Sequence, residues 1–270
     1  MKKINFFKMH GAGNDYIFVD ERKQAVASPE KLAAKMSRRR FSVGADGLVL
    51  ITRSETADCG MKIFNSDGSE GLTCGNALRC VAAYLYGKKR TLPKSFTVET
   101  ASGVREVSVG GKGGEIAVFM GKAAFRAESL PPVGVFVMPF SGKEYAFTAV
   151  SVGNPHAVAI VEDLSFDVAA VAQELQASGI FPFGVNVEFV TVRDGKINMR
   201  VVERGSGETL CCGSGACAAA SAVCRHGVLP FGEIEVICPG GKVKVEVGQD
   251  FSLILKGDAE FVFKGEYFYE

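Results

Sequence analysis

The second half of this chain repeats the first. Four segments recur in the same order across the 270 residues, each displaced by 138 to 140 positions, as Cys212 is from Cys74. The matched pairs are Gly13-Asn14 with Gly153-Asn154, Gly44-Ala45-Asp46 with Gly184-Val185-Asn186, Met61-Lys62-Ile63-Phe64-Asn65 with Met199-Arg200-Val201-Val202-Glu203, and Glu70-x3-Cys74-Gly75 with Glu208-x3-Cys212-Gly213. One shared dipeptide would carry no information, but four ordered matches at nearly one offset indicate an internal duplication. We therefore expect two similar lobes.

Local patterns predict the same kinds of elements in both halves. A helix is predicted from Ser28-Pro29 through Met36, with a capping hydroxyl and a proline in its first turn. Its counterpart begins near Ser165 or Asp167 and runs to Gly179, a terminating glycine. Alternating runs at 96–109 and 243–247 predict strands, with glycine-rich turns at 110–114 and 240–242. Strands joined by tight turns pair antiparallel, so the predicted fold class is α+β: two pseudo-symmetric lobes, each a mainly antiparallel sheet with few helices.

The domain boundary is predicted at 120–132, where periodicity weakens and Pro131-Pro132 stiffens the path. The N-terminal lobe then covers 1–121 and the C-terminal lobe 122–257. We expect the last strand, about 258–270, to pack back onto the first lobe. The active site is expected in the cleft between the lobes.

Composition excludes several classes of protein. The chain has 31 Lys+Arg against 30 Asp+Glu, a net charge of +1, which provides no basic field for nucleic acid. Apolar stretches such as 216–223 are far shorter than the ~20 residues that cross a bilayer. Lys8 and His10 interrupt the place where a signal peptide would have its apolar core. We expect a cytoplasmic protein whose partner is a small-molecule substrate.

The eight cysteines are not expected to form disulfides in a reducing compartment. Zinc ligands usually come in pairs two to four residues apart, whereas the clusters here read Cys74-x5-Cys80 and Cys211-Cys212-x4-Cys217. With only 3 histidines, a multi-histidine centre is also hard to assemble, so we predict no metal. Five of the cysteines are interpreted as small buried side chains: Cys59, Cys80, Cys217, Cys224 and Cys238.

Cys74 and Cys212 each precede a helix-compatible segment, at 77–86 and 216–225. We expect both to lie at helix N-termini, where unsatisfied N–H groups and the helix dipole favour an anion and lower the pKa of a thiol. The same N–H groups can hold a substrate carboxylate. Gly75 and Gly213 would let a ligand approach the backbone closely.

Two equivalent thiols indicate chemistry that a single thiol would not. One cysteine would suggest a nucleophile with His156 as its base, but a pair facing one carbon suits inversion of a stereocentre. One thiolate removes a proton from one face, and the opposite thiol returns a proton to the other. A carbanion next to a carboxylate needs that carboxylate among fixed donors in a dry pocket, and two helix N-termini supply such donors without metal or pyridoxal phosphate.

Four motifs resemble those of the diaminopimelate epimerase family. They are Met9-His10-Gly11-x-Gly13-Asn14-Asp15, Phe64-Asn65-x-Asp67-Gly68-Ser69-Glu70 with Cys74-Gly75-Asn76, Gly153-Asn154-Pro155-His156, and Glu203-Arg204-Gly205-x-Gly207-Glu208-Thr209 with Cys212-Gly213-Ser214-Gly215. The resemblance implies lobes in which a β-barrel-like sheet surrounds a central helix, and a homodimer. It also implies interconversion of LL- and meso-2,6-diaminopimelate without a cofactor, a step in lysine and peptidoglycan-precursor synthesis.

The resemblance assigns roles by position. Cys74 and Cys212, not Cys211, become the proton donor and acceptor. The implied substrate-binding residues are Asn14, Asn65, Gly75, Asn76, Asn154, Asn186, Glu203, Arg204, Gly213 and Ser214. Arg204 can hold a carboxylate in a bidentate fork. His156 and Glu203 resemble residues that adjust thiol protonation, and Glu203 would oppose a second thiolate.

Three positions depart from the family pattern. Ala77 stands where many members have glycine, Gly47 where some place a glutamine, and Phe183-Gly184 where an arginine is common. These departures concern the fine substrate contacts more than the reaction.

Other functions fit part of the same evidence. Proline racemase-type enzymes share the architecture and the cysteine pair, whereas phenazine-pathway isomerases lack the pair. A thiol redox sensor would use a disulfide between Cys74 and Cys212, and an amino-acid binding protein would need neither sulfur. Replacing each cysteine separately distinguishes these functions: binding kept with turnover lost indicates the enzyme.

Overall fold

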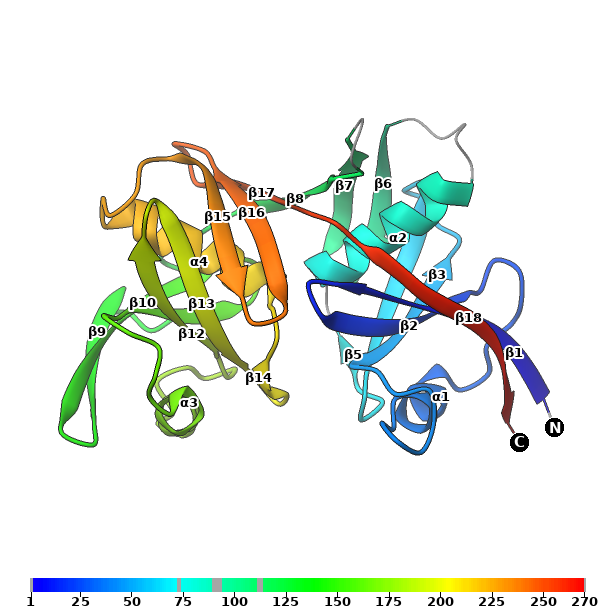
Figure 1. Cartoon of the computed structure of the whole chain (residues 1–270), viewed down its shortest axis with the longest axis horizontal. Helices are drawn as coiled ribbons and strands as arrows, with labels where there is room; N and C mark the ends of the chain where they lie inside the picture. The colour runs from blue at the N-terminus through cyan, green and yellow to red at the C-terminus, as the bar shows by residue number, and fades with distance from the viewer. Residues whose placement is uncertain (1, 72–73, 89–93, 111–113, 270) are drawn as a thin grey trace. The chain divides into compact units, whose positions relative to one another are not determined.

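The computed structural model describes residues 2–71, 74–88, 94–110 and 114–269. The chain forms two compact units, one of Met1–Phe119 with Gly257–Glu270 and the other of Met120–Lys256. The C-terminal strand β18 (Glu260–Tyr269) pairs antiparallel with β1 (Lys2–Gly11), so both ends of the chain lie side by side in the first unit (Figure 1).

The first unit is a sheet built around one long helix. Between β1 and β18 its elements are β2 (Asn14–Asp20), α1 (Pro29–Met36), β3 (Gly47–Thr52), β4 (Cys59–Asn65), β5 (Glu70–Gly71), α2 (Gly75–Lys88), β6 (Ser95–Thr100), β7 (Gly103–Val109) and β8 (Ile116–Lys122), whose end enters the second unit. Strand β1 pairs antiparallel with β2 and β18, β3 with β4, β4 with β5, β6 with β7, and β7 with β8. Two pairs, β2–β3 and β4–β6, are parallel.

The second unit repeats this topology element by element. Its elements are β9 (Val135–Phe140), β10 (Lys143–Ser151), β11 (Pro155–Ile160), α3 (Val168–Ala177), β12 (Asn186–Arg193), β13 (Lys196–Glu203), β14 (Gly207–Thr209), α4 (Gly213–Arg225), β15 (Gly232–Cys238), β16 (Gly241–Val247) and β17 (Ser252–Gly257). Strand β10 pairs antiparallel with β9 and β11, β12 with β13, β13 with β14, and β15–β16–β17 in series. The parallel pairs are β11–β12 and β13–β15. The predicted α+β fold of two duplicated, mainly antiparallel lobes is therefore confirmed.

Strand register corrects one of the four sequence matches. Tyr16 pairs with Gly47 in the first unit, and His156, which lies 140 positions after Tyr16, pairs with Asn186 in the second. The structural counterpart of Asn186 is thus Gly47 rather than Asp46. Counting along the same strands, the counterpart of Glu188 is Val49. The sequence match slipped by one residue because the loops that enter the two strands differ in length.

The two shorter helices begin and end where local signals predicted, with one exception. Helix α3 is capped by Asp167, whose side chain accepts from the Ala170 N–H at 3.1 Å, and Gly179 follows it at φ 76°. Helix α1 begins at Pro29 as predicted, but Ser28 adopts a left-handed backbone (φ 53°) and its hydroxyl makes no capping bond. The prediction of a Ser28 cap was wrong because that backbone does not have the extended conformation of an N-cap. The predicted turn at 110–114 falls partly on residues 111–113, outside the described residues.

Helices α2 and α4 are central to their units. Every residue of α4 except Ser214 and Arg225 is buried, and in Figure 1 the helix lies against strands of the second unit. A helix that is apolar on all sides is covered on all sides. Contacts with β10, β11, β12, β13, β15 and β16 enclose α4, while α2 packs on β1, β7 and β18. The first turn of each central helix is thereby held against the strands of its own sheet.

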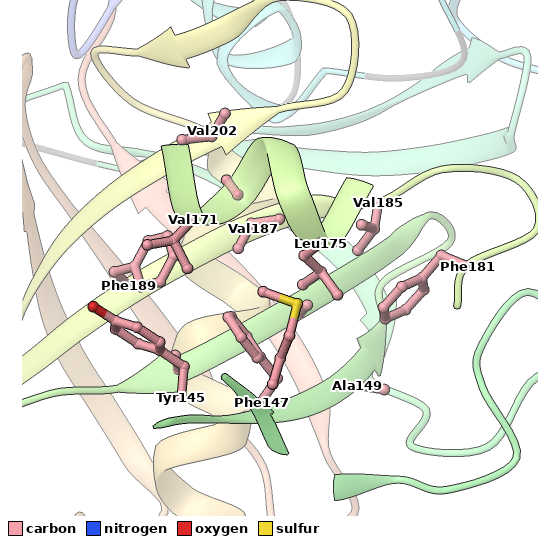
Figure 2. Close-up of a cluster of buried hydrophobic side chains, with 14 of the residues drawn as sticks. Tyr145, Phe147, Ala149, Val171, Leu175, Phe181, Val185, Val187, Phe189 and Val202 are labelled. Atoms are coloured by element: carbon pink, nitrogen blue, oxygen red, sulfur yellow. The ribbon is translucent and has the colours of Figure 1, made fainter. Parts of the chain in front are cut away.

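Apolar packing between α3 and the sheet fixes the second unit (Figure 2). Val171 and Leu175 of α3 face Phe147 and Phe189 of the strands, and all four are at most 1% exposed. The two phenylalanine rings meet edge to face with centroids 5.9 Å apart. In the first unit, α1 packs in the same way on β2 and β3 through Leu32, Ala33 and Met36. These cores set the strands that carry the polar residues described next.

Candidate active site

Cys74 stands immediately before α2, as predicted. Its carbonyl accepts the Leu78 N–H at 3.0 Å, the first hydrogen bond of the helix. The half-buried thiol donates to Asn14 Oδ1 at 3.4 Å, and Asn76 Nδ2 donates to the same oxygen at 3.1 Å. Three residues of the predicted site, from β2 and the start of α2, are thus in direct contact.

Asp46 fixes which way the Asn14 amide points, a role that the sequence prediction missed. Asn14 Nδ2 donates to Asp46 Oδ2 at 2.8 Å, so the amide oxygen is left facing the Cys74 thiol. Arg39 holds Asp46 at 2.8 Å and Asp15 at 2.6 Å. The only available signal for Asp46 was its place in the duplicated Gly-Ala-Asp motif.

Charged neighbours hold the Asp15 carboxylate ionised. Burial raises the pKa of Asp15, but hydrogen bonds and charge from Arg39 and Lys8 outweigh it, so the pKa is lowered. Lys8 Nζ lies 2.7 Å from Asp15 Oδ2. The loop that presents Asn14 is therefore anchored by ion pairs close to the candidate site.

Cys212 is the N-cap residue of α4, again as predicted. The Cys212 carbonyl accepts the Ala216 N–H at 2.9 Å, and its sulfur accepts the Gly215 N–H at 3.4 Å. The sulfur also lies 3.5 Å from Ser214 Oγ and is almost fully buried. Cys211 directly precedes this capping residue.

The pKa of Cys212 is raised, not lowered as its helix position led us to expect. Burial of the sulfur is the largest cause, and the nearby carboxylates Glu203 and Glu188 add to it. Hydrogen bonds from Ser214 and Gly215 act in the opposite direction but do not prevail. Cys212 is consequently a neutral thiol at neutral pH, because burial and two carboxylates outweigh the end of one helix.

Glu203 connects Cys212 to strand β13. Its carboxylate accepts from Thr209 Oγ1 at 2.5 Å and from the Cys212 side chain. Burial raises the pKa of Glu203, these two hydrogen bonds lower it, and the charge of Glu188 raises it further, with a net increase. A carboxyl group of raised pKa in contact with a thiol is suited to exchanging a proton with it.

Asn186 and Arg204 are joined through the backbone. Asn186 Oδ1 accepts the Arg204 N–H at 2.9 Å, and the exposed Arg204 guanidinium donates to the Phe183 carbonyl. A Cβ on Gly184, at φ 76°, would lie 2.4 Å from Arg204 Cδ. The Phe183-Gly184 departure therefore leaves the space that the Arg204 side chain occupies.

His156 is fully buried between two other polar side chains. Its Nδ1 lies 2.7 Å from Glu188 Oε1, and its Nε2 lies 3.1 Å from Asn154 Oδ1. The predicted residues His156 and Asn154 are thus brought together, and Glu188 joins them without having been predicted. Its signal in the sequence was an acidic residue between the apolar residues Val187 and Phe189, in a mainly apolar strand where carboxylates are rarely buried.

The remaining predicted positions lie near strand and helix ends. Asn65 ends β4, is exposed, and donates to Ser69 Oγ at 3.0 Å. Gly47 is its strand partner, and a Cβ there would lie 2.3 Å from the Phe64 carbonyl, so this backbone cannot accept the family's glutamine unchanged. Ala77 is wholly buried inside α2, so its methyl group is accommodated.

The first turns of α2 and α4 contain the predicted backbone donors. Gly75 and Asn76 open α2, and Gly213 and Ser214 open α4. Early N–H groups of a helix have no partner within it and attract carboxylates. Each unit therefore supplies a thiol, an asparagine and a helix N-terminus.

Two further properties concern ions and membranes. Within the described ranges, no group of three His, Cys, Asp or Glu side chains is arranged to hold a metal ion. None of the helices in the described part of the chain has both the length and the apolar character to cross a membrane.

Comparison with protein families gives one match over most of the chain. Residues 6–126 and 148–262 match the model of the diaminopimelate epimerase family. A diaminopimelate epimerase of Bacillus mycoides (strain KBAB4) is 40% identical over 285 residues, covering 100% of this chain and 99% of the relative. One of Bacteroides thetaiotaomicron is 41% identical over 269 residues, covering 98% of each.

Solved structures with less similar sequences share the fold. A PhzF-family phenazine biosynthesis protein of Bacillus anthracis superposes with a TM-score of 0.72 at 19% identity over 100% of both chains. A hydroxyproline epimerase of Agrobacterium vitis gives 0.73 at 14% identity, covering 99% of this chain and 91% of that one. At these identities the similarity concerns the fold alone.

Proposed function

The chain belongs to the diaminopimelate epimerase family and is an amino acid epimerase, and we propose that it interconverts LL- and meso-2,6-diaminopimelate through Cys74 and Cys212. The observation that carries the proposal is the equivalence of the two thiols. Each stands immediately before the central helix of its unit, with an amide, carboxylate or hydroxyl group beside the sulfur.

The reaction exchanges two protons at one carbon. A thiolate takes the proton from Cα, so that the C–H bond breaks as an S–H bond forms. The other thiol then gives its proton to the opposite face of the carbanion, and its S–H bond breaks as the new C–H bond forms. The enzyme ends with the two sulfurs in exchanged protonation states, which a reverse turnover or proton exchange with solvent restores.

Protonation assigns the first roles of the two sulfurs. Because burial and carboxylates raise the pKa of Cys212, that residue begins as the proton donor. Cys74 then serves as the base once its thiol, which donates to the Asn14 amide oxygen in this structure, has lost its proton at the N-terminus of α2. Glu203, hydrogen-bonded to Cys212, exchanges a proton with it between turnovers.

Substrate binding uses the polar groups around both thiols. The carboxylate of the reacting centre is bound by first-turn N–H groups at Gly75-Asn76 and Gly213-Ser214. The other end of diaminopimelate carries a carboxylate and an ammonium group, and these require both donors and acceptors. We assign that end to Asn65, Asn154, Asn186, Glu203 and Arg204. The product would serve lysine and peptidoglycan-precursor synthesis, and no cofactor enters the proposed steps.

Turnover in D2O tests the proposal directly. Reduced, metal-stripped protein is incubated with LL-diaminopimelate without pyridoxal phosphate, and loss of the Cα–H signal and formation of the meso isomer are followed by NMR and chiral chromatography. We expect exchange with epimerisation in the unmodified protein and in Cys211→Ala, a matched control that removes a neighbouring buried thiol. Both activities should be lost in Cys74→Ala and Cys212→Ala.

Other outcomes would redirect or refute the proposal. Racemisation of proline or another amino acid without action on diaminopimelate would keep the two-thiol chemistry and replace the substrate. Full activity in either Cys74→Ala or Cys212→Ala would refute the two-thiol mechanism. Absence of exchange with every amino acid tested would refute the assigned reaction.

A further inference from the structure

Glu188 is a buried carboxylate that the proposed proton transfers do not use. It is 0% exposed, and its Oε1 lies 2.7 Å from His156 Nδ1. Its second oxygen, Oε2, has no hydrogen-bond partner among the described residues. A buried carboxylate oxygen left without a partner costs free energy, which an apolar side chain at this position would avoid.

The duplication shows that the fold itself does not need this pair. In the first unit, the positions equivalent to His156 and Glu188 are Tyr16 and Val49, and that unit forms the same strands with the same pairings. The two central helices also differ at the matching position. A Cβ built on Gly215 of α4 would lie 2.6 Å from Glu188 Oε1, whereas α2 has Ala77 at the equivalent place. The Glu188–His156 pair is thus specific to the second unit.

The ring of His156 faces oxygen atoms on both sides. Glu188 Oε1 lies at its Nδ1, and Asn154 Oδ1 lies 3.1 Å from its Nε2. With the Glu188 carboxylate ionised, both oxygens are acceptors, and each ring nitrogen then carries a hydrogen that it donates. The other titratable groups nearby are Glu203 on β13 and Cys212 at the start of α4.

A protonated Nε2 fixes the orientation of the Asn154 amide. The amide oxygen turns toward the ring, so the NH2 group points away from it. Asn154 is half-exposed, whereas His156 and Glu188 are fully buried. The NH2 group is therefore the end of Asn154 that a ligand meets.

The first unit orients its equivalent asparagine in the opposite sense. Asn14 gives its NH2 group to the Asp46 carboxylate at 2.8 Å and presents its oxygen to Cys74. The two duplicated asparagines thus have opposite amide orientations. In the first unit both ends of the amide are held by protein groups, because the Asn14 oxygen also accepts from Asn76.

We propose that Glu188 is a positioning residue: by holding His156 doubly protonated, it turns the Asn154 amide so that its NH2 group binds a substrate carboxylate. The inference rests on the proposed function for the identity of that carboxylate. In Glu188→Gln the amide that replaces the carboxylate leaves the ring neutral, with Nδ1–H donating to the glutamine oxygen. His156 Nε2 then becomes an acceptor, Asn154 reverses its amide to donate to it, and an oxygen faces the substrate carboxylate.

Steady-state kinetics of single and double variants test the chain of contacts. For diaminopimelate we expect Glu188→Gln to raise KM by about tenfold or more, the range for losing a hydrogen bond to a charged group, with kcat changed much less. In an Asn154→Ala background, the same Glu188→Gln change should leave KM unaltered. Glu174→Gln, which removes a charge from the exposed surface of the same unit, is the matched control and should behave as the unmodified protein. Equal effects of Glu188→Gln with and without Asn154 would overturn the proposal, because Glu188 would then act independently of that amide.

Nitrogen NMR of the histidines gives a readout that does not need turnover. The chain has 3 histidines, so His156 is assigned by elimination with His10 and His226 variants. We expect both ring nitrogens of His156 to be protonated in the unmodified protein, and a non-protonated nitrogen to appear in Glu188→Gln. A neutral His156 in the unmodified protein would overturn the inference. Absence of epimerase activity with a protonated His156 would instead refute the proposed function and leave the Glu188–His156 chain intact.

Discussion

Replacing Gly215 by alanine tests the contact between the Glu188 carboxylate and the first turn of α4. A Cβ at this position would lie 2.6 Å from Glu188 Oε1 and 3.2 Å from Cys212 Cβ. Ordinary contact begins at 3.4 Å, so the oxygen has to move by about 0.8 Å to relieve the overlap. If the movement is directed away from His156, the Nδ1–Oε1 distance of 2.7 Å grows to about 3.5 Å, beyond a good hydrogen bond.

The energy of this change has two opposing parts. Weakening a hydrogen bond to a charged group costs about 1.5–3 kcal/mol. Alanine in place of glycine inside a helix returns about 0.8–1 kcal/mol. We therefore expect Gly215→Ala to lose about 1 kcal/mol of unfolding free energy, a fall of about 2–4 °C in Tm for a domain of this size. KM should rise as it does in Glu188→Gln, because the same contact is disturbed.

Thermal unfolding, the nitrogen NMR of His156 and the KM for diaminopimelate measure this effect. Ala77→Gly is the matched control, because Ala77 holds the equivalent place in α2 and is fully buried. The control should lose about 1 kcal/mol from helix propensity and leave the His156 spectrum unchanged. If Gly215→Ala were more stable than the unmodified protein and kept the same His156 spectrum, the close packing inferred for Glu188 would be refuted.

Three further predictions concern a thiol, an ion pair and the core. Burial and nearby carboxylates raise the pKa of Cys212, so its alkylation should have a higher pH midpoint than that of a free thiol, and Glu203→Gln should lower that midpoint. Mass spectrometry of alkylated peptides measures both midpoints. An unchanged midpoint in Glu203→Gln would contradict the role of the carboxylate. The pKa of Asp20 is lowered because hydrogen bonds from two basic neighbours outweigh its burial. The stability that ionised Asp20 contributes is present above the ordinary aspartate pKa and is lost as pH falls toward the pKa of Asp20 in the folded protein. The difference in Tm between the unmodified protein and Asp20→Asn should therefore shrink in acid, and a constant difference would contradict the ion pairs. Leu175→Ala should lower the unfolding free energy measured by chemical denaturation by about 2–5 kcal/mol, because Leu175 is 0% exposed. Leu210 is 53% exposed, so Leu210→Ala should lower it by under about 0.5 kcal/mol. Equal losses would contradict the packing in Figure 2.

The sequence by itself determined the duplication and the positions of the helices. The repeated motifs are recognisable in the amino-acid sequence, so the two-unit topology could be predicted before any contact was known. Helix starts at Pro29, Gly75 and Gly213 follow from neighbouring residues, because capping and first-turn chemistry act within about four positions. The two candidate thiols could be identified for the same reason: each lies beside its own helix signal.

Two local signals failed. Ser28 has the right side chain for a cap, but its backbone is left-handed and the side chain makes no capping hydrogen bond. The sequence match of Asp46 with Asn186 was wrong by one position, because strand register is determined by pairing between strands and not by sequence similarity along them.

Only the tertiary structure decided the electrostatics of the candidate site. Glu188 and His156 are 32 positions apart, and parallel pairing of β11 with β12 brings their side chains within 2.7 Å. The pKa of Cys212 likewise depends on burial and on carboxylates from two strands, which a helix-terminus argument does not contain. Charges act through space and through the dielectric of their surroundings, so the sequence identified the reacting groups, while folding determined their protonation and the direction in which each amide points.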